Sequence, residues 1–176
     1  MWTLMIQVKE VVKMAEIIKV YTEKTVAMRF IGKKYKKIGY WGDWFAKGWF
    51  DVIEKAMNEE SSPIKDGGYI GLEYRKNQEL LEYWIGMFTS QNTEVPEGFS
   101  CVDFSEGNLG ICWIYGKETE AHKAASKCAD KLADSGIKIK VDEEGGVCSF
   151  ENCVCPRFTT PDDKGNIILD YCYFAL

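Results

Sequence analysis

The sequence predicts an α+β fold in which two strand-helix-strand-strand modules, related by pseudo-twofold symmetry, build one antiparallel sheet. We expect the helices on one face of this sheet and a ligand groove on the other. The first observation is that the expected elements follow the same order in both halves of the chain. The second is that the last expected strand of each half carries a similar tripeptide, Leu81-Glu82-Tyr83 or Leu169-Asp170-Tyr171. An internal repeat constrains the whole fold.

Length and composition limit the number of domains. The chain has 176 residues, of which 46% are hydrophobic and 28% charged. At about 150 residues per domain, one globular domain is expected, and this composition excludes a disordered or collagen-like chain. We expect a short helix or lead-in over residues 1–20 and one domain over 21–176. Its half-modules should span about 21–92 and 93–176.

The first half reads as strand, helix, strand, strand. Residues 24–33 are rich in β-formers, and 69–74 and 82–88 are two further strands separated by a turn. Between them, 42–60 has apolar side chains at helical spacing, with Asp43 as the expected N-cap. These apolar positions are Phe45, Trp49, Val52, Ile53, Ala56 and Met57.

The second half repeats this order. Strands are expected over 101–104 and 108–116, followed by an amphipathic helix over 118–134 that ends at Gly136. Residues 149–158 are extended or mixed in pattern, and the last strand covers 167–174.

Charge and cysteine content argue against several classes of protein. The formal net charge is -5, whereas a nucleic-acid-binding domain is usually basic. Seven cysteines, an odd number, and no secretory signal predict a reducing, cytoplasmic location rather than a disulfide framework. No apolar run is long enough to span a membrane. One close cysteine pair and a single histidine do not make a zinc site, so we expect neither metal nor cofactor.

Two acids on strands are the first candidates for a site. Because strand side chains alternate between faces, Asp170 shares its face with apolar neighbours, and Glu82 shares its own with Trp84 and Phe88. An acid in an apolar wall needs a compensating partner, such as a bound cation. The alternative is an acid at a strand rim that pairs with a lysine or arginine of the chain.

Aromatic residues, 14% of the chain, are the second candidates. On the open face of a sheet they could stack on a flat ligand, and a ring face attracts a cation. The strand rings considered are Tyr69, Tyr74, Trp84, Trp113, Tyr115 and Phe174. Three tryptophans near the first helix, Trp41, Trp44 and Trp49, are expected in the core. His122, among charged residues, is expected on a solvated helix face.

Several of these segments resemble the GyrI-like small-molecule-binding family. They are the Tyr69-Ile-Gly-Leu segment, YWIGM at 83–87, VPEGF at 95–99 and the closing strand 167–174. The resemblance covers about residues 17–176 and implies the paired-module fold described above. It also implies a groove for amphipathic, often cationic, aromatic compounds. Family members serve as effector-binding domains of AraC-type multidrug-responsive regulators or stand alone.

The resemblance also points to individual residues. The family's acid on the final strand is normally Glu, and here that position holds Asp170. A second family feature, a Glu followed two residues later by Tyr, appears as Glu151 with Cys153 in the Tyr position.

Three functions follow as alternatives. The first is a binding module that senses or sequesters lipophilic cations. The second is a hydrolase that opens cyclopropane rings of electrophilic compounds through Glu82 and Asp170, without metal or organic cofactor. The third is a gyrase-inhibitor-like partner of another protein. About 20 residues precede the first expected strand, so no DNA-binding module is expected. The apolar start (Trp2, Leu4, Met5) is expected to cap the groove or to form a homodimer contact.

Overall fold

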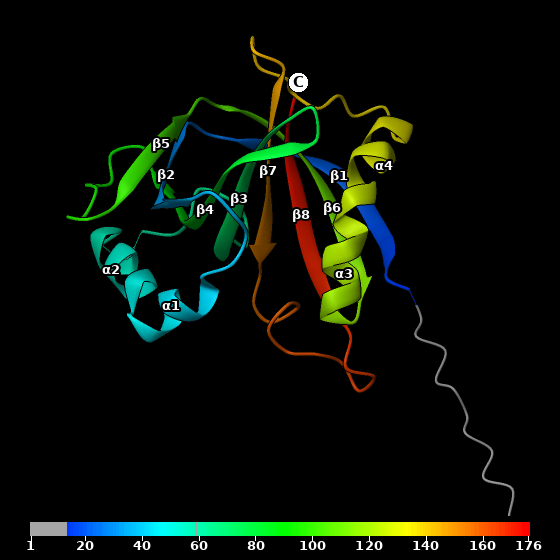
Figure 1. Ribbon diagram of the computed structural model, residues 1–176, viewed down its shortest axis with the longest axis horizontal. Coiled ribbons are helices and arrows are strands. Elements are labelled where there is room, and N and C mark those ends of the chain that lie inside the picture. The colour runs from blue at the N-terminus through cyan, green and yellow to red at the C-terminus, as the bar shows by residue number, and fades with distance from the viewer. Residues whose placement is uncertain (1–13, 59) are drawn as a thin grey trace, which may run out of the picture.

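An eight-stranded antiparallel sheet forms the centre of the computed structural model, which describes residues 14–58 and 60–176 (Figure 1). The strand order is β1-β6-β8-β7-β3-β4-β2-β5. The strands are β1 (Glu16–Thr25), β2 (Met28–Tyr35), β3 (Tyr69–Lys76), β4 (Glu79–Ser90), β5 (Ser100–Phe104), β6 (Gly107–Gly116), β7 (Gly146–Cys153) and β8 (Ile167–Ala175). The helices are α1 (Trp41–Ala46), α2 (Trp49–Ala56), α3 (Glu118–Ala124) and α4 (Cys128–Asp134), with a 3-10 turn η1 (Ala125–Lys127).

The predicted repeat is confirmed by the topology. The first module runs β2, α1, α2, β3, β4 and the second β6, α3, α4, β7, β8. In space they form β2-β4-β3 and β6-β8-β7, and β3 pairs with β7 at the centre of the sheet. Each module thus contributes three strands to the sheet in the same spatial order, as pseudo-twofold symmetry requires.

The two outer strands cross between the halves. β1 comes first in the chain but pairs with β6 of the second module, and β5 pairs back with β2 of the first. The predicted division at residues 92 and 93 therefore separates the modules in sequence but not the edge strands in space. The predicted lead-in differs as well, because residues 16–20 already belong to β1. Trp2, Leu4 and Met5 lie outside the described residues.

The sheet is strongly curled around the face that carries no helices. Phe104 on β5 and Phe174 on β8 stack with ring centroids 4.5 Å apart. These strands are five positions apart in the sheet, and in a flat sheet five spacings of about 4.8 Å would separate them by roughly 24 Å. Gly32 and Gly86 face each other across β2 and β4 on this inner face. Side chains from both modules fill the space, so that this face is core.

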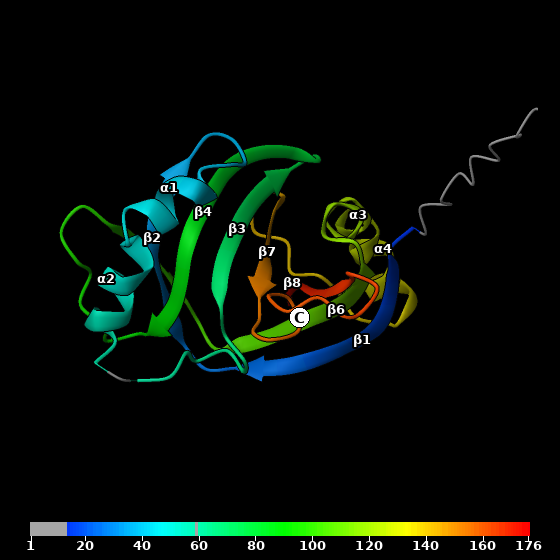
Figure 2. The same cartoon turned by 90° about the horizontal axis from the view of Figure 1, so that it is seen from below.

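The other face carries all the helices. Figure 2 shows α1 and α2 over the first module and α3 and α4 over the second, with central strands between them. Trp44 is fully buried beneath α1, as expected for a core tryptophan. The helix expected over 42–60 is instead two helices, because Gly48 adopts a left-handed conformation (φ 62°) between them. The first begins at Trp41 without a side-chain cap from Asp43.

The helix expected over 118–134 is present, interrupted by one 3-10 turn. Gly136 follows it with φ 76°, as predicted for a C-terminal glycine. Within residues 14–58 and 60–176, no helix has the length and apolar character needed to cross a membrane.

The close approach of β2 and β4 gives a test of the curl. A Cβ atom at Gly86 would collide with the carbonyl oxygen of Ile31 and the Cα of Gly32. We expect Gly86→Ala to lower the free energy of unfolding by about 1–3 kcal/mol, because backbone must move to admit the methyl group. Urea denaturation measures this. Gly42→Ala, whose added Cβ has no atom within 4 Å, is the control; an equal loss in both variants would contradict the packing argument.

Candidate functional site

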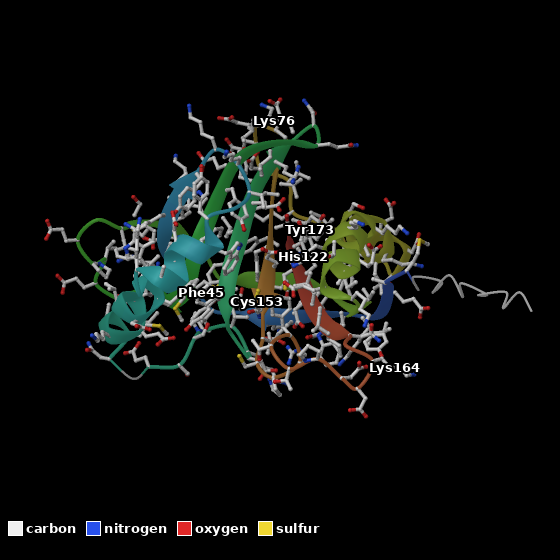
Figure 3. The ribbon with its side chains drawn as sticks, turned by 60° about the horizontal axis from the view of Figure 1, so that its bottom comes forward. Phe45, Lys76, His122, Cys153, Lys164 and Tyr173 are labelled. Carbon is white, nitrogen blue, oxygen red and sulfur yellow. The ribbon has the colours of Figure 1, made fainter. Side chains whose placement is uncertain are left out.

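A cleft of about 1330 Å³ opens on the helix-bearing face, between the helices of the two modules. Residues of β3 and β7 form its floor, α1 one wall, and α3 and α4 the other. Figure 3 shows Phe45 and His122 on opposite sides of the central strands, with Cys153 between them. The groove predicted on the helix-free face is therefore not where the cleft lies. The curl of the sheet fills that face with its own side chains, and the gap between the helix pairs remains open.

Glu151 lies at the floor of the cleft, on β7 opposite Gly71 of β3. Its side chain is only 14% exposed. A Cβ at Gly71 would come within 2.6 Å of Glu151 Oε1 and 2.7 Å of the Tyr83 hydroxyl. The glycine thus leaves the space that the carboxylate occupies.

A chain of polar contacts crosses the cleft through Glu151. Trp41 Nε1 donates to the Tyr83 hydroxyl at 2.8 Å, and this hydroxyl donates to Glu151 Oε1 at 3.4 Å. His122 Nδ1 lies 3.0 Å from Glu151 Oε2. The carboxylate consequently connects α1 and β4 of the first module to α3 of the second.

The cleft has more acidic than basic side chains. Its carboxyl groups belong to Glu54, Asp66, Glu73, Glu118, Asp130 and Glu151, whereas its basic groups are those of Arg75 and His122. Arg75 Nε is held by Glu73 at 2.5 Å. The hydrogen bond to Glu151 raises the pKa of His122, although burial opposes this. The balance of charge favours a cation in the cleft.

Aromatic rings surround these acids. The rings are those of Trp41, Phe45, Tyr69, Phe158, Tyr171 and Tyr173. Burial, followed by the charge of Glu54, raises the pKa of Tyr69 to about 12, so its hydroxyl stays neutral near pH 7. Phe45 is 60% exposed although it is large and apolar. Such rings present faces to which a cation is attracted.

Two of the sequence candidates, Tyr69 and Glu151, line this cleft. The others share the opposite, helix-free side of the strands. They are Tyr74, Glu82, Trp84, Trp113, Tyr115, Asp170 and Phe174. Trp84 packs in the inner core, and Trp113 and Phe174 pack against it. The predicted alternation of side chains between the two faces of each strand is correct. The face that is open, however, is the one that carries the helices.

The two predicted acids have partners within the chain. Asp170 is 3% exposed, and Arg157 holds it through Nε at 2.9 Å and Nη2 at 2.7 Å. Burial raises the pKa of Asp170, and these two bonds oppose the rise. Glu82 accepts from Lys34 at 3.1 Å and from Trp84 at 3.0 Å. Both acids therefore pair with a basic side chain of the chain itself, Asp170 with Arg157 and Glu82 with Lys34. This pairing was the alternative considered from the sequence.

His122 is the site residue that sequence reasoning missed. It faces the cleft rather than a solvated surface. A signal was present, since His122, Ser126 and Ala129 follow helical spacing and all line the cleft. Ser126 and Ala129 have small side chains, so this face of the helical segment leaves open space in the cleft. Within residues 14–58 and 60–176, no group of three His, Cys, Asp or Glu residues is arranged to hold a metal ion.

Comparison with known proteins shows the fold. No family model matches the sequence, and no curated protein does. SAV2435 bound to tetraphenylphosphonium superimposes over 90% of this chain and 94% of its own, with TM-score 0.63 and 9% identity. A putative bacterial transcription regulation protein from Staphylococcus aureus MU50 matches over 89% and 97%, with TM-score 0.59 and 10% identity. A hydrolase from Listeria innocua matches over 90% and 92%, with TM-score 0.51 and 9% identity.

The buried ion pair gives a test of the role of Asp170. We expect Arg157→Met to lower the free energy of unfolding by about 3–5 kcal/mol, because it leaves the Asp170 carboxylate buried without its partner. Asp170→Asn should cost less, since it removes the buried charge and leaves Arg157 beside Asp66. Urea denaturation of both variants distinguishes this role from a ligand-binding one. Equal losses would argue against a structural ion pair.

Proposed function

We propose that the chain is a GyrI-like small-molecule-binding domain whose cleft binds amphipathic cations that carry aromatic groups. The observation that carries the proposal is the carboxylate of Glu151, mostly buried at the floor of a cleft lined by aromatic rings. An acid in this position binds a cation more strongly than one in open solvent, because the local dielectric is lower.

The size and lining of the cleft fit this class of ligand. Sites for drug-sized molecules usually enclose about 300–1,000 Å³ and combine apolar walls with a few polar groups. Here the volume, about 1330 Å³, lies above that range and leaves room for a bulky ligand, and aromatic side chains from both modules form much of the wall. The tetraphenylphosphonium in the SAV2435 structure is a lipophilic aromatic cation, which supports the same ligand class for this fold. A cytoplasmic role in sensing or sequestering such compounds follows as part of the proposal.

A hydrolase is the second candidate, and a specific contact favours it. The His122–Glu151 pair, with the Tyr83 hydroxyl beside it, places groups capable of general acid or base catalysis next to each other. The hydrolase from Listeria innocua shares the fold. In this reading the reacting carboxylate is Glu151, in place of the Glu82 and Asp170 considered from the sequence, because Glu151 reaches the cleft.

Tetraphenylphosphonium and the isosteric anion tetraphenylborate test the binding proposal. Trp41, one of six tryptophans, lines the cleft, so a change in the protein's tryptophan fluorescence should report binding. We expect the cation to bind in preference to the anion, and Glu151→Gln to weaken its binding at least about tenfold, as loss of a charged contact does. Glu82→Gln, which removes an acid from the opposite face, is the matched control and should leave the affinity unchanged.

Two results would change the assignment. Equal binding of the cation by Glu151→Gln and the parent protein would rule out Glu151 as its counter-charge. Conversion of a cyclopropane-bearing electrophile, with turnover lost but binding kept in Glu151→Gln, would favour the hydrolase.

A further inference from the structure

His122 lies beside the carboxylate that the proposed function assigns to a bound cation. Its Nδ1 is 3.0 Å from Glu151 Oε2, and both side chains line the cleft. The imidazole is 38% exposed, so its proton can exchange with solvent. Its ring meets that of Phe158 edge-on, with the ring centroids 6.3 Å apart. When His122 is protonated, the cleft contains a cation of its own, and this one can lose its charge.

We propose that a cationic ligand replaces the imidazolium of His122 as the counter-charge of Glu151, and that His122 releases its proton when the ligand binds. This inference rests on the proposed function and adds its coupling to pH. One positive charge enters the cleft with the ligand, and one proton leaves from the imidazolium to the buffer. The net charge around Glu151 is thereby kept.

Among the groups around His122 that are described below, none of the tyrosines or cysteines changes its charge near neutral pH. From β7 it meets Glu151, and from its own helix the charge of Glu118. From β4 the Tyr83 hydroxyl shares the Glu151 carboxylate. Burial raises the pKa of this tyrosine, as it raises those of Cys153 on β7 and of Tyr171 and Tyr173 on β8. These groups stay neutral between pH 5 and 8, the range in which histidine titrates.

The other charged pairs that involve cleft residues, Glu73 with Arg75 and Asp66 with Arg157, behave differently. Glu73 on β3 is held by Arg75, whose guanidinium stays protonated at every pH of interest. A ligand cannot remove the charge of either arginine. Among the ion pairs that the described residues form in the cleft, His122–Glu151 is the one in which the cation can be neutralised.

The direction of the pH effect follows from linkage. Glu151 raises the pKa of His122, and a neighbouring ligand cation should lower it. Below both pKa values the imidazolium stays charged and opposes the ligand. Between them the affinity for a cation rises with pH by up to about tenfold per unit, since one proton is released. Above both values the affinity no longer depends on His122.

Calorimetry with tetraphenylphosphonium tests the coupling, because this probe has no proton to lose. Titrations near pH 6.5 in phosphate and in ACES buffer, which have different ionisation enthalpies and add no aromatic cation, give the number of protons released. We expect a value between zero and one for the parent protein. His122→Gln should release none and bind with an affinity that stays flat from pH 5.5 to 8.5. His122→Lys, with its permanent charge, should bind weakly at every pH.

The ring signals of His122 provide a direct readout. It is the single histidine of the sequence, so its NMR titration is unambiguous. We expect its pKa above 6.5 in the empty protein, lower in Glu151→Gln, and lower again with tetraphenylphosphonium bound to the parent protein.

The outcomes separate the two proposals. Binding of tetraphenylphosphonium without proton release, at an affinity independent of pH, would overturn the coupling and leave the binding function intact. A structural role of His122 alone would give this result, because a tether between α3 and β7 need not change its protonation. Absence of binding by the folded protein would overturn both proposals.

Discussion

The curl of the sheet is the constraint on which the rest of the structure depends. It brings Phe104 of the edge strand β5, which pairs with β2 of the first module, against Phe174 on β8 of the second, and it closes the helix-free face around one core. Gly32 and Gly86 permit it by letting the two backbones approach without side chains between them. Once this face is closed, the remaining open space lies between the two helix pairs. The position of the cleft thus follows from a packing requirement on the opposite side of the sheet.

The same constraint explains why Glu151 is at the centre of the molecule. β3 and β7 are the inner strands of their modules and pair with each other, so a side chain on the outer face of β7 points between the helices. Gly71 provides the room, Tyr83 and Trp41 reach the carboxylate from one module, and His122 from the other. A ligand that contacts Glu151 would therefore act on a carboxylate to which side chains of both modules are bound.

The sequence predicted the modules better than the site, for a physical reason. Periodicity and turn residues report local structure, and they identified the strands around Tyr69, Glu82 and Asp170 and the two helical regions. They also assigned alternate residues to opposite faces correctly. Which face is open depends on contacts between β5 and β8, strands five positions apart in the sheet, and no local pattern encodes those contacts. For this reason Asp170 became a groove candidate although Arg157, thirteen residues earlier, holds it in the core.

Two carboxylates at the floor of the cleft have different basic partners. Glu73 on β3 and Glu151 on β7 both line the cleft. Glu73 is bound by the guanidinium of Arg75, which lies two residues further along the same strand. This partner keeps its charge at every pH of interest. Glu151 is bound by the imidazole of His122 from a separate helix. A histidine free of such partners has a pKa near 6.5, and Glu151 raises that of His122. A carboxylate whose counter-charge can leave as a proton can accept a cation at lower electrostatic cost than one held by a guanidinium. Under the proposed function, this asymmetry between two otherwise similar modules would direct a cationic ligand to the carboxylate of the second.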